Sequence, residues 1–293
     1  MSYLPQTLST ADESSLISAY QRLEYPSFAA RLSNVVGTPI EMGIKLLPRQ
    51  WYFNVQRCAE HGISKALDVA VARVKHNTGG RSDDLRYRMM GMASGAIGGF
   101  FGGPALLLEL PITTTLMLSS IVDIARSQGE DICSLESRMA CMEVFALGGR
   151  SHADDAAETG YYGIRTALEI PIASASSFLA RQGTTVSGNA PVLVTLIQTL
   201  AERFGVVLSQ KTAAEFIPVI GAVGGAFINS VFIQHFQDMA HSHFTIRRLE
   251  RKYDPALIQS AYERVRKNRI KLSYGKSAQG KRHRLPKPII AAA

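Results

Sequence analysis

The segment from His152 to Arg165, HADDAAETGYYGIR, gathers the side chains best suited to chemistry. On a helix, four of these side chains would lie within about 60° of one another and form a polar stripe: Asp154, Glu158, Tyr161 and Arg165. Asp155 and Tyr162 would flank this stripe. Such a stripe can bind a cation or a polar headgroup, or exchange protons with a substrate. It can equally be a solvated face of pairs at i,i+4 spacing. Because charge is scarce in the surrounding helices, we expect the stripe to line a polar pocket or a contact surface.

A second candidate site follows a long apolar run and contains His235, Asp238 and His241. On one helix these side chains spread over about 120°, wider than the i,i+4 histidine pair of a helical zinc site. A metal site here would need further ligands, such as Asp154, Asp155 or His152. We therefore expect interfacial or hydrogen-bonded histidines and no cofactor, while a metal site stays an open alternative.

A third candidate is Glu109, placed between the apolar residues 105–108 and Leu110. A carboxylate there is costly unless it has a partner or lies at an interface. Its surroundings, Leu-Glu-Leu-Pro-Ile at 108–112, return as Leu-Glu-Ile-Pro-Ile at 168–172 and hint at a duplicated helical unit. Pro111 predicts a break before a second apolar helix over 113–126.

Two uncharged, glycine-rich runs, 89–108 and 216–234, organise the elements that must position these residues. Glycines recur every fourth residue in the first run and at the same spacing in the second, which also holds a lone amide: Gly91, Gly95, Gly99, Gly103, Gly221, Gly225 and Asn229. On a helix this spacing forms a smooth strip, a glycine zipper. Each glycine costs about 1 kcal/mol relative to alanine, which a closely packed backbone or a lipid environment must offset. We expect these residues to pack helices together.

The first run reaches the length of about 20 residues that crosses a bilayer. Glycine is only weakly apolar, however, and Pro104 interrupts its end. Length therefore permits a membrane span without requiring one. The run lacks the dinucleotide-binding glycine pattern, and the chain has no complete P-loop, so a phosphate site is not indicated.

Composition places the chain between ordinary soluble proteins and integral membrane proteins. Charged residues make up 19% of its 293 residues and the mean hydropathy is +0.04, whereas about 25% charge is typical of soluble domains. The three cysteines, Cys58, Cys133 and Cys141, form no even framework, which favours a reducing compartment. Residues 1–15 show no secretory signal. We expect the cytoplasmic side.

The positive charge of the chain is concentrated near its end. Residues 247–287 hold fourteen Lys or Arg and three acids, a balance of +11, against a net charge of +8 for the whole chain. Such a segment can contact anionic lipid, at about 1 kcal/mol per basic residue, or can be a solvated end. Aromatic residues do not alternate with the basic ones, so we expect no nucleic-acid partner.

The apolar pattern predicts an all-α, multi-helix bundle with two glycine-rich apolar helices packed closely together. Thr10 and Glu13 form a capping box for a helix over 11–25, residues 51–76 keep a helical period, and no useful strand-like alternation occurs. We expect an N-terminal helical arm over 1–80, a helical core over 81–255, and a basic helix and tail over 256–293.

Three stretches together resemble the bacterial EcsC protein family: GAIGGFFGGPALLLELPITTTLMLSSIVDIARSQGED at 95–131, DDAAETGYYGIRTAL at 154–168 and IPVIGAVGGAFINSVF at 217–232. They occur in the expected order, and the similarity covers about residues 45–255. The family is named after a gene beside an ABC transporter operon linked to protein secretion and processing. The resemblance therefore implies a partner and not a reaction.

We expect a non-enzymatic accessory protein at the inner face of the bacterial membrane, with a membrane surface or a membrane protein as its partner. A homo-oligomer stays open. One alternative is a metal-dependent hydrolase built from the 152–165 stripe and the 235–243 histidines. Another is a soluble helical scaffold whose glycines only allow close helix crossings.

Overall fold

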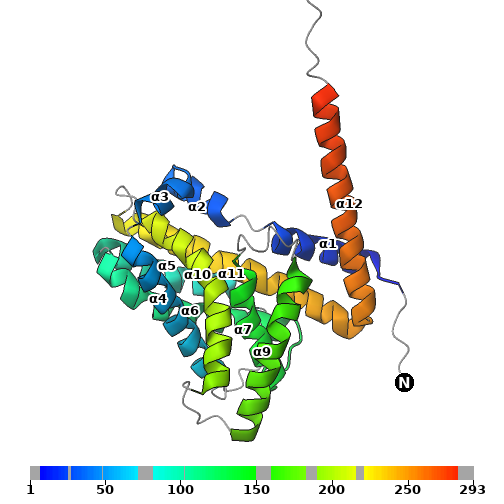
Figure 1. Cartoon of the computed structure of the whole chain (residues 1–293), viewed down its shortest axis with the longest axis horizontal. Helices are drawn as coiled ribbons and strands as arrows, with labels where there is room; N and C mark the ends of the chain where they lie inside the picture. The colour runs from blue at the N-terminus through cyan, green and yellow to red at the C-terminus, as the bar shows by residue number, and fades with distance from the viewer. Residues whose placement is uncertain are drawn as a thin grey trace, which may run out of the picture.

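The computed structural model describes residues 7–25, 28–47, 49–71, 82–101, 103–149, 160–182, 190–215 and 221–282. Within these ranges every regular element is an α-helix (Figure 1), which confirms the predicted all-α bundle. The helices are α1 (Thr10–Glu24), α2 (Phe28–Val36), α3 (Ile40–Leu46), α4 (Arg49–Val71), α5 (Asp84–Phe101), α6 (Gly103–Ser127), α7 (Leu135–Leu147), α9 (Tyr161–Gln182), α10 (Pro191–Glu215), α11 (Gly221–Lys252) and α12 (Pro255–Arg282).

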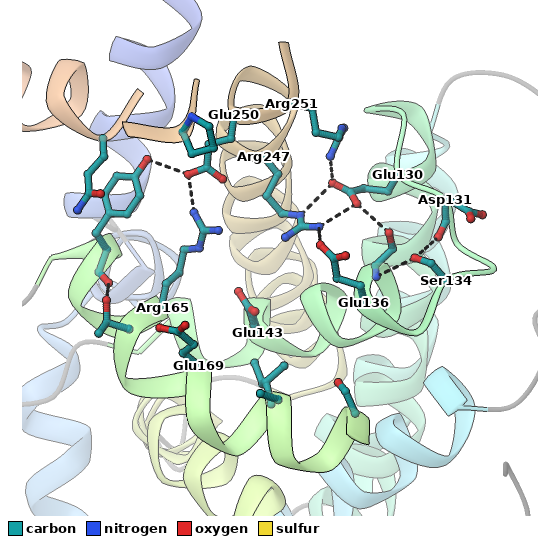
Figure 2. Close-up of a pocket in the computed structure, with 18 of the residues that line it drawn as sticks. Glu130, Asp131, Ser134, Glu136, Glu143, Arg165, Glu169, Arg247, Glu250 and Arg251 are labelled. Atoms are coloured by element: carbon teal, nitrogen blue, oxygen red, sulfur yellow. Dashed lines mark hydrogen bonds and ion pairs between the residues drawn. The ribbon is translucent and has the colours of Figure 1, made fainter. Parts of the chain in front are cut away.

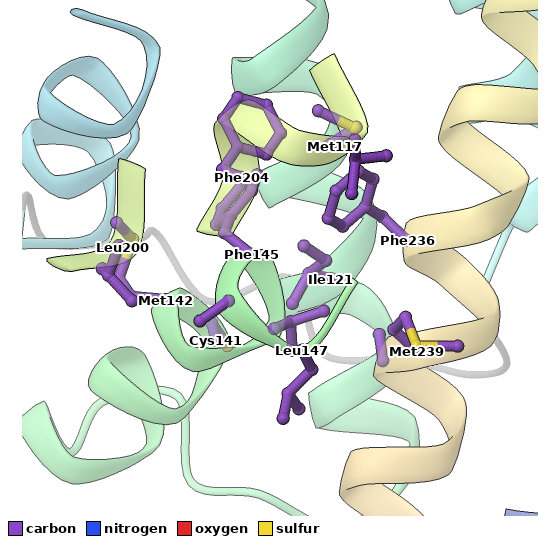
Figure 3. Packing of buried hydrophobic residues seen from close by; sticks show 14 of the residues in the cluster. Met117, Ile121, Cys141, Met142, Phe145, Leu147, Leu200, Phe204, Phe236 and Met239 are labelled. Atoms are coloured by element: carbon purple, nitrogen blue, oxygen red, sulfur yellow. The ribbon is translucent and has the colours of Figure 1, made fainter. Parts of the chain in front are cut away.

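The long helix α11 runs through the middle of the bundle (Figure 1) and contacts α1, α2, α5, α6, α7, α10 and α12. Its residues Phe232, Phe236 and Phe244 are completely buried. The ring centroid of Phe236 lies 5.7 Å from that of Phe145 on α7 and 5.5 Å from that of Phe204 on α10 (Figure 3). Because aromatic side chains bury the largest apolar areas, the core is centred where these three helices meet.

Helices α5 and α11 approach each other at the predicted glycine strip. A Cβ atom on Gly95 would lie 2.5 Å from the carbonyl oxygen of Gly225 and 2.6 Å from Cβ of Asn229. On Gly91, it would overlap the side chain of Ile233. The side-chain amide Nδ2 of Asn229 donates to the carbonyl oxygen of Gly91 at 2.7 Å. The contact at these positions leaves no room for a larger side chain.

Three other predicted packing positions fall at helix ends. Gly99 lies in the last turn of α5, Gly103 begins α6 and Gly221 begins α11. What surrounds these three glycines lies outside the described residues, so their packing role stays a prediction.

The break predicted at Pro111 is wrong, because α6 continues through this residue from Gly103 to Ser127. Leu110 and Thr113, on either side of the proline, are buried. The hydroxyl of Thr114 donates to the carbonyl oxygen of Leu110 at 2.7 Å. An interior proline costs about 3 kcal/mol, and burial of both flanks in the core offsets this cost.

The helices before residue 80 pack onto the bundle. Helix α4 contacts α6, α7 and α10, and its residues Val55, Ala59 and Ile63 belong to the same buried cluster as the cores of α7 and α10. Helix α1 contacts α11 and the beginning of the chain's last helix, α12, which projects from the body (Figure 1). The domain boundaries at 80 and 255 stay predictions.

Candidate functional site

A polar groove lies where α7, α9 and α11 meet the loop between α6 and α7 and the first turns of α12 (Figure 2). Its volume is about 1000 Å³. Six carboxylates and three guanidiniums line it: Glu130, Asp131, Glu136, Glu143, Glu169, Glu250, Arg165, Arg247 and Arg251. A concave surface with convergent polar groups is the usual place for a ligand, so this groove is the candidate site.

An ion pair between Arg165 of α9 and Glu250 of α11 forms one side of the groove. Nη1 of Arg165 donates to Oε1 of Glu250 at 2.7 Å, and the hydroxyl of Tyr162 donates to the same oxygen at 3.0 Å. The guanidinium carbon of Arg165 also lies 5.4 Å from the ring centroid of Tyr161, within cation–π range. Burial and then the charge of Glu250 raise the pKa of Tyr162, so its hydroxyl stays a donor. Two predicted site residues, Tyr162 and Arg165, thus line the groove.

Glu130 anchors the opposite side. Nε of Arg247 donates to its Oε1 at 2.9 Å, the hydroxyl of Ser137 donates to its Oε2 at 2.8 Å, and Arg251 also pairs with it. Burial raises the pKa of Glu130, but the hydrogen bond and charge of Arg247 outweigh burial and leave the pKa below its ordinary value. Arg247 also contacts Glu136 at 3.2 Å. The charges on this side are therefore mutually neutralised.

Glu143 of α7 lies between these two ion pairs and takes part in neither (Figure 2). Its Oε2 atom is buried without a hydrogen-bond partner, 3.7 Å from Nε2 of His243, which also lacks one. Nδ1, on the other side of the His243 ring, lies 3.0 Å from the hydroxyl of Tyr161. A buried chain of three groups, Tyr161, His243 and Glu143, therefore reaches the groove.

Burial raises the pKa of Glu143 to about 7, although Arg165 and Arg247 oppose this shift. Burial also holds the pKa of His243 well below its ordinary value, so the ring is neutral. A carboxyl group that titrates near neutrality suits acid–base work or pH-dependent binding. Sequence reasoning missed Glu143; the available signal was a lone acid inside the apolar segment MACMEVFAL.

We expect the free energy of unfolding of the wild type, measured relative to Glu143→Gln, to fall as pH rises from 4.5 to about 7. Because its pKa is higher in the folded than in the unfolded protein, the native state holds this proton more tightly. That stabilisation is complete below the unfolded value and is lost as pH rises through the folded value. Urea unfolding of both proteins across this range measures it. Parallel curves would show that the Glu143 carboxyl titrates normally.

The three residues predicted as metal ligands face different partners. Nε2 of His235 lies 2.9 Å from the carbonyl oxygen of Gly148, and Asp238 accepts from Arg31 at 2.7 Å. Nε2 of His241 lies 2.6 Å from a carboxylate oxygen at the start of α5. Burial lowers the pKa of His235 to about 4, so this ring is neutral. In the part of the chain that the structure describes, no three His, Cys, Asp or Glu side chains are grouped to hold a metal.

Asp154, Asp155 and Glu158 of the predicted stripe lie outside the described residues, so their role stays a prediction. The other end of the stripe begins α9, where the backbone amide of Tyr161 donates to Oε1 of Glu24 at 2.9 Å. Glu24 ends α1 and thereby caps α9, which fixes the start of the helix that carries the groove-lining side chains.

Glu109 does not line the groove. It is buried where α6 meets α10, and its Oε1 accepts from Nζ of Lys211 at 3.2 Å and from the hydroxyl of Thr113 at 3.1 Å. Lys211 is completely buried and also pairs with Glu215 at 3.0 Å. Two carboxylates thus share one ammonium group inside the core. This arrangement supplies the partner that an acid in an apolar run requires.

Comparison with known proteins adds a family. The model of the EcsC protein family matches residues 60–249, which include α5, α6, α7, α9, α10 and nearly all of α11. No curated protein and no solved structure matches the chain.

Proposed function

Because the chain belongs to the EcsC protein family, which is named after a neighbour of a transporter operon, we propose that it is a non-enzymatic accessory protein of the membrane. It associates with the inner face of the bacterial membrane and supports a transporter or an envelope process. The observation that carries this proposal is an exposed apolar surface on α5 and α11.

This surface, the apolar ridge, consists of four side chains with exposed fractions of 64%, 61%, 72% and 51%: Leu85, Met89, Val223 and Phe227. Each helix contributes two of them at i,i+4 spacing, which places both on one face. The hydroxyl of Ser230 on α11 accepts from Arg88 on α5 at 3.4 Å along one edge of the helix contact. Met89 lies two residues before Gly91, and Phe227 lies two residues before Asn229. Because Gly91 and Asn229 face the other helix, Met89 and Phe227 point away from the α5–α11 contact, toward the outside of the helix pair.

Single exposed apolar residues are ordinary, whereas four on the outer faces of two neighbouring helices favour a contact surface. Complete burial of a large apolar side chain is worth about 1.5–3 kcal/mol, so each of these side chains that enters a bilayer favours membrane binding. The exposed Arg86 of α5 adds a positive charge to the same helix, and anionic headgroups attract such charges. These features support a membrane surface as the partner.

Helix α10 (Pro191–Glu215) is the one described helix long and apolar enough to cross a membrane. Half of its most apolar window is buried inside the bundle, as in the core helices of soluble proteins. The proposal therefore concerns association with the surface and does not depend on a membrane span.

The metal-dependent hydrolase has less support. Its histidine-side ligands, His235, Asp238 and His241, face separate partners in the described part of the chain. Only Tyr162 and Arg165 of the predicted stripe are known to line the groove.

Replacing Met89 and Phe227 together by aspartate is expected to reduce binding to vesicles of bacterial lipid composition by at least about tenfold, because two apolar anchors become charged. Sedimentation with vesicles measures the bound fraction. Phe53→Asp is the matched control, since Phe53 is 74% exposed but lies on α4, which packs mainly against α6, α7 and α10.

If Phe53→Asp loses as much vesicle binding as the double variant, the apolar ridge is not the membrane-binding surface. A wild-type protein that stays in the supernatant at low salt would overturn membrane association and favour the soluble scaffold.

A further inference from the structure

The groove has more negative charge than its own guanidiniums neutralise. Arg165 pairs with Glu250, while Arg247 and Arg251 pair with Glu130, and Arg247 also contacts Glu136. Three lining carboxylates remain that have no arginine or lysine partner among the described residues: Asp131, Glu143 and Glu169. Because these carboxylates are not neutralised by the protein, the groove favours a ligand that carries several positive charges.

Glu143 has a buried neighbour, Nε2 of His243, that forms no hydrogen bond. His243 is completely buried, its Nε2 lacks a hydrogen-bond partner, and it points at Oε2 of Glu143 from 3.7 Å. Nδ1 of His243 lies 3.0 Å from the hydroxyl of Tyr161, so Nε2 is the ring nitrogen that faces the Glu143 carboxyl. The side chain of Glu143 is 14% exposed, and this part opens into the groove. A buried polar pair left unsatisfied needs an explanation, and a cation on Glu143 provides one by stabilising its charged form.

We propose that the groove binds an aliphatic polyamine, with ammonium groups on Glu143 and Glu169 and methylene segments against the apolar part of the lining. Each ammonium group has three donors and suits carboxylate oxygens. Ile172, Ala173 and Pro255 supply apolar surface in the same lining. This site is independent of the apolar ridge and adds a ligand to the membrane role.

The form of the ligand follows from the spacing of charge. A single metal ion needs several acids grouped around one point, and the described residues contain no such group. An anion would meet six carboxylates against three guanidiniums. A flexible chain with separated ammonium groups matches acids distributed along a groove of about 1000 Å³. A lysine side chain has the same head group but only one charge.

Binding should strengthen as pH rises through the pKa of Glu143, about 7, because the ionised carboxylate attracts the ammonium group. The charged or titratable groups that face Glu143 come from α9, from α11 and from α7 itself: Arg165, Tyr161, Arg247, Glu250, His243, Glu136 and Cys141. His243 stays neutral throughout because its pKa is held far lower.

Titration calorimetry of the full-length protein with spermidine at low salt tests the proposal. The expected result is saturable binding, weakened by at least about tenfold in Glu143→Gln and in Glu169→Gln, because each loses one charge-assisted hydrogen bond. Glu169 is exposed, so its replacement leaves the fold intact even if Glu143→Gln does not fold. Glu202→Gln is the control, since Glu202 is exposed on α10 outside the groove and should bind like the wild type.

Absence of saturable heat with the wild type would overturn the proposal. Equal weakening in the Glu202 variant, or displacement of spermidine by an equal concentration of Mg²⁺, would reduce the effect to general attraction of counterions and overturn it as well. Nα-acetyl-lysine amide binding as tightly as spermidine would assign the groove to protein lysines and not to a polyamine.

Discussion

Gly95→Ala is expected to destabilise the protein by about 1–2 kcal/mol, although alanine is the better helix former. The new Cβ would meet the backbone oxygen of Gly225 at 2.5 Å and Cβ of Asn229 at 2.6 Å. Backbone cannot rotate away, so α5 and α11 must separate. Overpacking of this kind costs about 1–3 kcal/mol or more, and the gain of about 1 kcal/mol in helix propensity offsets only part of it. Gly95→Leu should prevent the close contact altogether.

Ala93→Leu provides the control for this prediction. Ala93 lies on the same helix, two residues away, and is exposed, so a larger side chain there meets solvent. Thermal unfolding followed by circular dichroism compares the variants. If Gly95→Ala melts at or above the wild-type temperature, the helices tolerate a side chain at this contact and the packing explanation fails.

Lys211→Met is expected to have the largest effect of any single substitution considered, a loss of about 3–5 kcal/mol in the free energy of unfolding. The change removes the ammonium group that Glu109 and Glu215 share and leaves two acids in the core. Burial already raises the pKa of Glu215 to about 7, and Lys211 opposes that rise. Without the lysine the carboxyls must hold protons to remain buried. The loss should therefore be greater at pH 8 than at pH 5.

Lys65→Met is the matched control, because Lys65 pairs with Asp68 on the surface and both side chains are 54% exposed. Exposed pairs contribute little, so this variant should stay within about 0.5 kcal/mol of the wild type. Urea unfolding at both pH values measures the difference. Comparable stability for the Lys211 and Lys65 variants would mean that the buried cluster is not needed for folding.

The helical content was predictable because it rests on local spacing. Gly91 and Gly95 lie against α11, and the packing role of the whole glycine strip stays a prediction. Glycines four residues apart share one helix face whatever the rest of the chain does, and so do the apolar residues of α4. Tyr162 and Arg165 of the predicted stripe line the groove, and the functional role of the stripe stays a prediction. Continuity of α6 through Pro111 was not predictable, since it depends on how deeply the flanking residues are buried.

The central residue of the groove was set by tertiary structure. Glu143 becomes distinctive only because α9 and α11 place Arg165, His243 and Arg247 around it, and these residues lie far from it in sequence. Its pKa follows from that burial. The ion pairs on the two sides of the groove also join residues that are distant in sequence. Arg165 and Glu250, for example, are 85 residues apart.

Glu109 and Glu169 show where local sequence stops being informative. Both are the second residue of a five-residue pattern, Leu-Glu-Leu-Pro-Ile at 108–112 and Leu-Glu-Ile-Pro-Ile at 168–172. Both also lie in helices that continue through the proline. Glu109 is buried against Lys211, whereas Glu169 is exposed in the groove. The sequence by itself determined two helices with an acid at equivalent positions. Which acid became a core ion pair and which became available to a ligand depended on the helices packed against each one, because a charge is buried only where the fold supplies its partner.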